Sequence, residues 1–347
     1  MGIREVAKRA RVSIATVSRT LNKPSAVDPE TAERVRRAVD ELRYYPDRQA
    51  RALVSGRSHI LGLIVSDITN PFFPELVKGF EDAALHRGYE IMLSSTDYDP
   101  VRMAQCVRRM IEWKVEGVAI MTSEMDQPLI DQLVRRKVPT VFLDVGAVHT
   151  LISNILVDYA AGIDEAVRHL LALGHSRIGF ISGPIRLKSA SIRRSAFLDC
   201  LERAGLLEDV ELVREGDHTI DGGLEAMTKL LEVAGPPTAV LASNDLTAIG
   251  AMRAVRRIGW SVPDDVSVVG FDDIRFASFT EPPLTTVALS RRELAEKAIH
   301  ALLDAVGRGE QASLGTECVI TPSLVVRYST AAPRTSAARS DRIAFGH

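Results

Sequence analysis

Short apolar runs alternate with amphipathic segments along the chain from residue 60 onward. Each run precedes a turn and a segment with apolar positions at helical spacing, such as 74–88, 160–174 and 246–259. The apolar runs are ILGLIV (60–65), EIMLSS (90–95), GVAIM (117–121), TVFLD (140–144), RIGFIS (177–182), AVLAS (239–243) and VSVVGF (266–271). Unbroken apolar strands that alternate with helices are typical of parallel sheets covered on both faces. Seven such units exceed one small sheet, so the pattern predicts an α/β body of two lobes.

The first 22 residues show a shorter, helical pattern. Val6 and Ala10 lie four positions apart on one helical face, and Val17 and Leu21 do the same on a second helix. Between these segments stands Ser13, a good N-cap, because its hydroxyl can accept a hydrogen bond from the amide of residue 15 or 16. The pattern therefore predicts two short helices joined by a tight turn.

A third helix is predicted after Asp28, which can cap it, with Pro29 at its first position. Its apolar residues Val35, Val39 and Leu42 are expected to face inward. Three short helices with a tight turn between the first two indicate a helix-turn-helix head. The second helix of such a head offers a small, polar, cationic face to the major groove of DNA.

The charge of the chain is unevenly distributed. Residues 1–57 hold 13 lysines and arginines against 7 acidic residues, a net charge of +6, whereas the remainder carries −8. A basic head on an acidic body favours a polyanionic partner for the head alone. A merely solvated charged surface explains the number of charges but not their asymmetry.

Composition is that of an ordinary globular protein, with 46% hydrophobic and 25% charged residues. No apolar run approaches the roughly 18 residues of a membrane span, and MGIREVAKRA lacks the apolar core of a signal peptide. Three widely spaced cysteines, Cys106, Cys200 and Cys318, are expected to be reduced core residues rather than a disulfide set or a metal site. We therefore expect a cytoplasmic protein.

The segments IREVAKRARVSIATVSRTLN (3–22), YYPDRQARAL (44–53) and ILGLIVSDITNPFF (60–73) resemble the LacI/GalR family of bacterial regulators. The resemblance extends from residue 2 to about residue 328. It implies a periplasmic-binding-protein-like body of two Rossmann-like lobes, preceded by the helix-turn-helix head and a hinge helix. The ranges expected are 1–46 for the head, 47–59 for the hinge, 60–328 for the body and 329–347 for a disordered tail. The lobes are expected at 61–160 with 291–320, and at 162–289 with 321–328.

One position in the head departs from the family pattern. The turn between the first two helices usually carries Gly or Asn, where this chain has Arg11. A left-handed backbone there costs arginine about 1 kcal/mol more than glycine. The substitution adds a cation that can reach a phosphate.

The resemblance also implies a set of DNA contacts. Arg19 can pair bidentately with guanine and Ala15 can meet a thymine methyl, whereas Ile14 either contacts a base or packs at the edge of the core. Leu53 of the hinge is expected to enter the minor groove, with Arg48, Arg51 and Arg57 neutralising phosphates, unless it packs on the body. The full set of candidates is Ser13, Ile14, Ala15, Thr16, Ser18, Arg19, Asn22, Arg51 and Leu53.

Ligands of parallel α/β sheets bind beyond the carboxyl ends of the strands. The residues that follow the predicted strands therefore give the candidates for an effector site: Phe72, Phe73, Ser123, Asp144, Arg193, Asn244, Asp245 and Asp272. Phe73, Arg193, Asp245 and Asp272 match effector-contacting positions of the family. Structural roles remain open for three of the candidates, because Asn244 and Asp245 can cap the next helix and Asp272 can hold a turn.

Two departures bear on the class of effector. Many sugar-responsive members carry a second arginine where this chain has Ser191, and the family commonly carries an aromatic residue where this chain has His218. A lone histidine more often makes a structural hydrogen bond, and a purine needs a stacking partner at that place. Carboxylates, an arginine and an amide suit the hydroxyls of a sugar or sugar acid, so we rank these above purines.

The chain shows no motif of catalysis, such as GxSxG, GxxxxGK[ST], GxGxxG or HExxH. We therefore expect neither an enzyme nor a cofactor, although a solute-binding protein for transport would share the predicted body. After Tyr328 the chain lacks the leucine heptads of a tetramerisation helix. The expected assembly is a homodimer on a near-palindromic double-stranded DNA operator, with a small-molecule effector, a carbohydrate, and no membrane.

Overall fold

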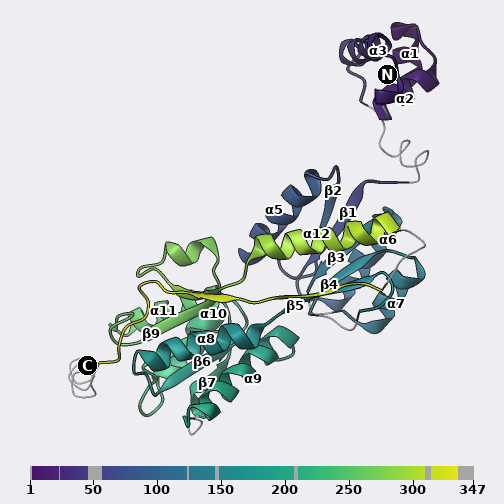
Figure 1. Ribbon diagram of the computed structural model, residues 1–347. Coiled ribbons are helices and arrows are strands. Elements are labelled where there is room, and N and C mark those ends of the chain that lie inside the picture. Colours follow the sequence, from purple (N-terminus) through teal and green to yellow (C-terminus); the bar gives the residue numbers. More distant parts are fainter. Residues whose placement is uncertain are drawn as a thin grey trace. The chain divides into compact units, whose positions relative to one another are not determined.

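The computed structural model describes residues 2–22, 24–45, 57–122, 125–144, 148–206, 210–308 and 314–334. The chain divides into two compact units, which comprise residues 1–59 and 60–347 and are called here the head and the body (Figure 1). No helix in the described ranges is long and apolar enough to span a membrane.

The head is built from the predicted short helices around a small core of its own. Val6, Val17 and Val35, one from each of the three α-helices, are fully buried and in mutual contact with small alanines. The elements are α1 (Ile3–Ala10), α2 (Ile14–Asn22), the 3₁₀ turn η1 (Pro24–Ala26) and α3 (Pro29–Glu41). The structure thus confirms the predicted helix-turn-helix arrangement.

The turns of the head follow from single residues. The Ser13 hydroxyl accepts a hydrogen bond from the Thr16 amide at 3.1 Å, and an Asp28 carboxylate oxygen accepts one from the Thr31 amide at 3.0 Å. Arg11 ends α1 in the left-handed conformation, with φ 55° and ψ 48°, as the family pattern predicted. The caps satisfy amides that a helix start leaves without an intrahelical partner.

The first lobe of the body holds a six-stranded parallel sheet in the order β11-β5-β4-β3-β1-β2. Its strands are β1 (Ile60–Val65), β2 (Glu90–Ser95), β3 (Gly117–Met121), β4 (Thr140–Leu143), β5 (Ile152–Val157) and β11 (Glu317–Ile320). Its helices are α5 (Phe72–Leu85), α6 (Pro100–Glu112), α7 (Gln127–Arg135) and α12 (Arg291–Arg308). Helices α5 and α12 pack on one face and α6 and α7 on the other, since two separate apolar clusters occupy the two faces.

The second lobe holds another six-stranded sheet, in the order β12-β10-β9-β8-β6-β7. Its strands are β6 (Ile178–Ser182), β7 (Val213–Glu215), β8 (Ala239–Ala242), β9 (Ser267–Asp272), β10 (Thr285–Ala288) and β12 (Ser323–Val325). Its helices are α8 (Tyr159–Ala172), α9 (Lys188–Arg203), α10 (Ile220–Leu231) and α11 (Asp245–Arg257), with short 3₁₀ turns η2 (Val210–Leu212) and η3 (Arg275–Ser278). The edge strand β12 is antiparallel to β10. The predicted doubly covered sheets are therefore present, with one antiparallel edge.

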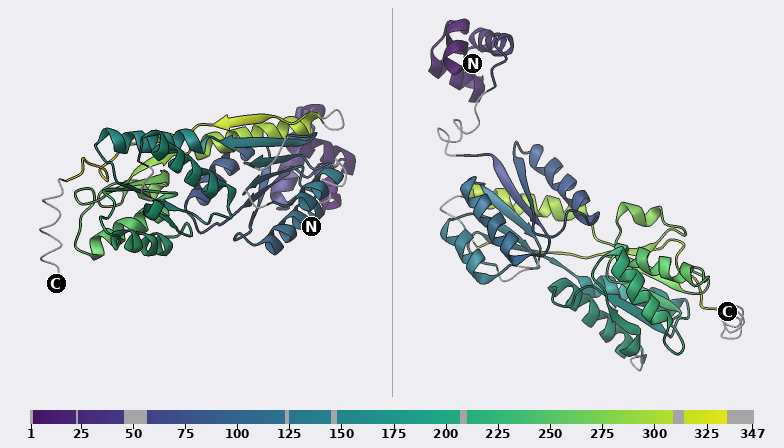
Figure 2. Two further views of the ribbon diagram at one scale, coloured as in Figure 1. Left: turned by 90° about the horizontal axis from the view of Figure 1, so that it is seen from below. Right: turned by 180° about the vertical axis from the view of Figure 1, so that it is seen from behind.

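The chain passes between the lobes at three places within the described body: at Asp158, at residues 289–290 and at residues 321–322 (Figure 2). Strand β11 consequently completes the first sheet and strand β12 the second, although only two residues separate them. Each lobe is assembled from segments far apart in the sequence.

One expectation about the end of the chain is wrong for residues 329–334. Ser329 is fully buried, and its hydroxyl donates to the Val268 carbonyl at 2.6 Å and accepts from the Thr285 amide at 2.8 Å. Arg334 pairs with the carboxylate of Asp265 at 3.1 Å. These residues are small and polar, yet the second lobe supplies the partners that order them. Residues 335–347 lie outside the described residues.

Candidate functional site

Helix α2 of the head turns its apolar side to the core and a polar side outward. Val17 and Thr20 are buried, whereas Ile14 is 45% exposed. Ser13, Ala15 and Arg19 are exposed, Thr16 and Ser18 are half-buried, and Asn22 is the last residue of the helix. Two roles were predicted for Ile14, a base contact or packing at the edge of the core. Because Ile14 lies outside the core cluster, it does not pack at the edge of the core. Arg51 and Leu53 lie outside the described residues.

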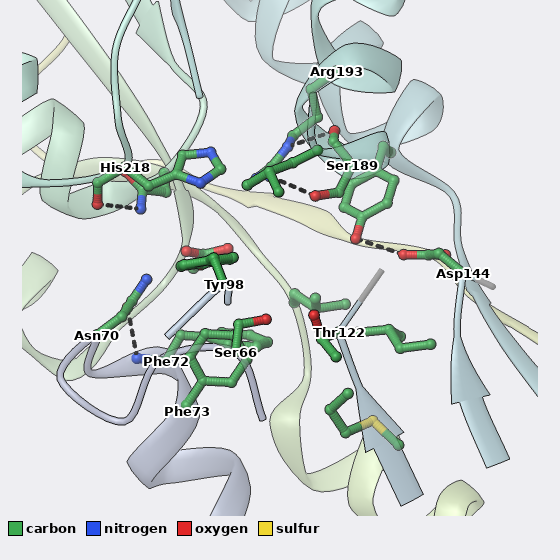
Figure 3. A pocket seen from close by; sticks show the side chains of 17 residues that line it. Ser66, Asn70, Phe72, Phe73, Tyr98, Thr122, Asp144, Ser189, Arg193 and His218 are labelled. Carbon is green, nitrogen blue, oxygen red and sulfur yellow. Dashed lines mark hydrogen bonds between the residues drawn. The ribbon is translucent and has the colours of Figure 1, made fainter. Parts of the chain in front are cut away.

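The body contains a hollow of about 660 Å³ between its lobes, counting the part open to solvent. Both lobes contribute walls, since Ser66, Phe72 and Phe73 approach from one side and Arg193 and His218 from the other (Figure 3). The lining residues are Ser66, Asn70, Phe72, Phe73, Tyr98, Met121, Thr122, Leu143, Asp144, Tyr159, Leu187, Ser189, Arg193, His218, Asn244, Asp272 and Leu289. Most of them follow the carboxyl ends of strands, where ligands of such sheets bind.

Arg193, on α9, is a buried guanidinium held by carbonyl oxygens. Its Nε donates to the Ser189 carbonyl at 3.1 Å, and one terminal nitrogen donates to the Ser243 carbonyl. The guanidinium carbon lies 5.2 Å from the ring centroid of Tyr159 and 5.1 Å from that of Phe271. Among the described residues, no carboxylate lies within ion-pair distance of Arg193. A buried cation without a counter-ion is costly unless a ligand supplies acceptors.

Asp272, the last residue of β9, places a carboxylate in the same pocket. The residue is 8% exposed, and no described residue donates a hydrogen bond to its carboxylate oxygens. Burial raises the pKa of Asp272 to about 7, although the charges of Arg193 and Arg291 oppose the rise. The pocket thus offers one acceptor group and one donor group, Asp272 and Arg193, that the protein leaves incompletely used.

Asp144 differs from Asp272, because both its carboxylate oxygens already accept hydrogen bonds. The donors are the Val157 amide at 2.9 Å and the Tyr159 hydroxyl at 2.8 Å. Figure 3 shows the second of these bonds. Burial raises the pKa of this carboxyl. Lys188 of the second lobe donates to the Asp144 backbone carbonyl at 2.6 Å. Asp144 lines the pocket as predicted, but much of its hydrogen-bonding capacity fixes Tyr159 in place.

The predicted candidates on α11 separate into two cases. Asn244 lines the pocket and also caps the helix, since its side-chain oxygen accepts from the Thr247 amide at 2.9 Å. Asp245 does not line the pocket, and its prediction as an effector contact is wrong. Its carboxylate is fully buried and accepts from the Ile274 amide at 2.8 Å and the Thr286 hydroxyl at 2.5 Å. Ser123 lies outside the described residues.

His218 lines the pocket and was absent from the predicted set. Its ring packs on Gly183, where a Cβ atom would lie 1.8 Å from the His218 Nε2. Nε2 is buried without a hydrogen-bond partner among the described residues. Burial, with a smaller contribution from Arg193, lowers the pKa of His218 to about 3, so the imidazole is neutral at physiological pH. The sequence did offer a signal for His218, because it occupies the position at which family members carry an aromatic residue.

A helix-turn-helix head on a two-lobed body with a polar pocket defines a DNA-binding regulator with a ligand-binding domain. The descriptions "Bacterial regulatory proteins, lacI family" and "Periplasmic binding protein-like domain" match residues 2–47 and 167–330, respectively. The HTH-type transcriptional repressor CytR of Escherichia coli K12 is 32% identical over 330 residues, which cover 95% of this chain and 96% of CytR. The chain belongs to the LacI family of bacterial transcriptional regulators.

Other relatives share nearly the whole length of the chain. The ribose operon repressor of Escherichia coli K12 is 35% identical over 302 residues, covering 87% of this chain and 92% of that protein. The lac repressor dimer bound to operator and the anti-inducer ONPF matches with a TM-score of 0.84 and 30% identity, covering 96% of this chain and 99% of that one. The regulator CelR in complex with cellobiose matches with a TM-score of 0.71 and 31% identity, covering 95% and 99%.

Proposed function

We propose that this regulator acts as a homodimeric repressor whose affinity for a near-palindromic operator is set by a sugar or sugar acid bound between the lobes. The observation that carries the proposal is the presence of Arg193 and Asp272 in one pocket, each buried and each without a salt-bridge partner among the described residues. Neighbouring hydroxyls of a sugar can donate to the carboxylate and accept from the guanidinium. Each buried polar group then gains a partner.

The relatives support the proposed class of effector and the assembly. Cellobiose is bound in the CelR complex, and the lac repressor is a dimer on its operator. Phe72, Phe73 and Tyr159 also give the pocket aromatic surface, which favours a purine nucleoside as the second candidate. A transport protein is not supported, because the lacI description matches the head.

The pocket is proposed to bind its ligand without transforming it. Catalysis at a serine needs a base within hydrogen-bond reach of the hydroxyl. Within the described chain, the Ser189 hydroxyl accepts from Arg193, and Ser66 has neither a histidine nor a carboxylate as a hydrogen-bond partner. We therefore expect binding without turnover, which ligand recovered unchanged after incubation would support.

A thermal-shift screen of sugars, sugar acids and purine nucleosides tests the proposed effector class. A sugar that raises the melting temperature of the parent protein should raise that of Arg193→Gln and Asp272→Asn far less. Losing one charge-assisted hydrogen bond weakens binding by about ten- to a hundredfold. Asp131→Asn, on the outer helix α7, is the matched control. Stabilisation by nucleosides alone would overturn the sugar assignment.

Gel shifts with genomic fragments test the role of the head. Arg19→Ala is expected to abolish the preference for the operator over random DNA, whereas Arg36→Ala on the exposed face of α3 should leave that preference intact. Binding of the parent protein should weaken steeply with salt, because basic residues that contact phosphates release counterions. An equal loss of specific and non-specific binding in Arg19→Ala would reduce Arg19 to a phosphate contact.

A further inference from the structure

At one edge of the pocket, an ion pair of the first lobe binds the backbone of the second. Arg291 is the first residue of α12 and Glu75 lies in the first turn of α5, and these two helices pack against each other. The Arg291 Nε lies 2.9 Å from one carboxylate oxygen of Glu75. The side chains are only 19% and 32% exposed, respectively. We call this pair the Glu75–Arg291 clamp.

The clamp holds residues 272–275, the segment that follows β9 in the second lobe. The two terminal nitrogens of Arg291 donate to the backbone carbonyls of Asp272 and, at 2.8 Å, of Asp273. The second carboxylate oxygen of Glu75 accepts from the Arg275 amide at 3.0 Å. One ion pair thus provides hydrogen-bond partners for three backbone groups within residues 272–275. Hydrogen bonds of this kind, with a charged donor or acceptor, are stronger than neutral ones.

The held segment adopts a conformation that needs such support. Asp272 has φ 111° and Asp273 has φ 55°, values that non-glycine residues rarely adopt. Backbone of this kind persists where its surroundings determine it. Asp272 also carries the pocket carboxylate to which no residue in the described ranges donates a hydrogen bond. Asp245 and Arg327 of its own lobe hold the neighbouring residues 274 and 273, and the opposite lobe supplies the contacts at the carbonyls of 272 and 273 and at the amide of 275. The orientation of Asp272 therefore depends in part on contacts made by the opposite lobe.

We propose that the Glu75–Arg291 clamp positions the Asp272 carboxylate in the pocket and couples the pocket to helices α5 and α12. This inference rests on the proposed function of the pocket as the effector site. A ligand that draws Asp272 toward itself moves the two carbonyls bound by Arg291. The movement of these carbonyls displaces Arg291, the first residue of α12, and Glu75 of α5. A ligand shifts such an equilibrium by its differential affinity for the two lobe arrangements.

Hydrogen exchange of the full chain, without DNA or ligand, tests the clamp directly. In Glu75→Ala and Arg291→Ala the Arg275 amide is expected to exchange at least about tenfold faster, as local opening of a held segment requires. The double variant should add little to either single one, because both residues act on the same segment. Glu75→Gln keeps an acceptor for that amide and should retain part of the protection.

Arg292→Ala is the matched control. Arg292 is the next residue of α12 and pairs with Glu296 at 2.9 Å, but it is 86% exposed and has no hydrogen bond to the described part of the second lobe. This variant should leave the exchange of the Arg275 amide unchanged. Amides of β9 should exchange alike in all variants, which separates loss of the clamp from global destabilisation.

The titration of Asp272, followed by NMR of labelled aspartate carboxyls, tests its positioning. Arg291→Ala should move the Asp272 titration to higher pH, since one nearby positive charge is removed, and Arg291→Lys should partly restore it. Exchange and titration identical to those of Arg292→Ala would overturn the proposal. Neither measurement uses effector or operator. A negative result for the proposed effector can therefore be distinguished from a negative result for the Glu75–Arg291 clamp.

Discussion

At the scale of single residues, the pocket stores unfavourable free energy that a ligand can relieve. Arg193 is buried against two aromatic rings and carbonyl oxygens, and Asp272 is buried with no hydrogen bond to its carboxylate from any residue that the structure describes. A core chosen only for stability would pair or replace such groups. Their survival in one cavity is the clearest residue-level sign of a binding site.

The first prediction concerns the pH dependence that Asp272 imposes. Its pKa is about 7 in the folded protein and near 3.8 in the unfolded chain, so the folded protein binds the extra proton between these values. The free energy of unfolding therefore falls as pH rises from about 4 to 7, by on the order of 4 kcal/mol. Asp272→Asn removes this loss. Its stability relative to the parent should be greater at pH 8 than at pH 5 in urea titrations, and parallel pH curves would contradict the assignment.

The second prediction concerns the packing of His218 on Gly183. A Cβ at residue 183 would lie 1.8 Å from the His218 Nε2, so Gly183→Ala must displace the ring. We expect a loss of about 1–3 kcal/mol of stability from this overpacking. In the background of His218→Ala the same substitution should cost much less. Denaturation of the four proteins of this cycle measures the coupling, and additive losses would show that the ring is not what Gly183 accommodates.

At the scale of elements, helices α10 and α11 approach so closely that glycine is required at their contact. A Cβ at Gly250 would lie 2.0 Å from the Ile220 carbonyl oxygen, and one at Gly223 would lie 2.3 Å from that of Thr247. Backbone atoms cannot move aside as a flexible side chain can. The two helices therefore pack backbone to backbone, and each begins close in sequence to a pocket residue, His218 for α10 and Asn244 for α11.

The third prediction follows from this contact. Gly250→Ala is expected to destabilise the body by about 3 kcal/mol or more, because overpacking here involves backbone atoms. Gly307→Ala on α12 is the control, since no atom of the described residues lies within 4 Å of the added methyl group. That substitution should instead stabilise its helix by roughly 0.5–1 kcal/mol. Thermal unfolding of the two variants measures the expected loss of stability in the first and the expected gain in the second. Similar melting temperatures would contradict the close approach of the helices.

Elements with a strong local pattern could be predicted from the sequence, and those defined by pairing could not. All seven apolar runs form strands, with bounds that differ by a residue at most. Strand β5 was missed because it carries Ser153 and Asn154, and β10 because it carries Thr285 and Thr286. Strands β7, β11 and β12 have only three or four residues at sheet edges. Such strands exist because a neighbour offers hydrogen bonds, which no local pattern records.

The same limit applies to the site. Position after a strand was enough to place Phe72, Phe73, Asp144, Arg193, Asn244 and Asp272 at the pocket. It could not show that Asp245, next to Asn244, turns toward β9 and β10 instead. Gly270 leaves room for that carboxylate, since a Cβ there would lie 2.1 Å from the Asp245 Oδ1. The direction of one side chain thus depends on a glycine 25 residues away.

At the scale of the whole molecule, the fourth prediction concerns residues 329–334. A chain that stops after Tyr328 loses the Ser329 hydroxyl, which bridges β9 and β10, and the carbonyl of Ala331, which lies 2.8 Å from the His175 Nε2. We expect this truncation to lower the stability of the body by several kcal/mol, since buried polar groups lose their partners. A chain that stops after Arg334 keeps these contacts and should melt at a higher temperature than the shorter one. Equal melting of the two truncated proteins would contradict the packing of this segment.

The three passages of the chain between the lobes have a consequence for synthesis. Translation delivers residues in order, at about 5–20 residues per second, and domains fold as they become complete. The head is complete after about its first 45 residues, whereas the first sheet lacks β11 and the second lacks β12 until residues 317–325 emerge. A nascent or prematurely terminated chain therefore carries a finished DNA-binding head before either half of its sensor is whole. Such a fragment has the complete head but neither complete sheet of the body.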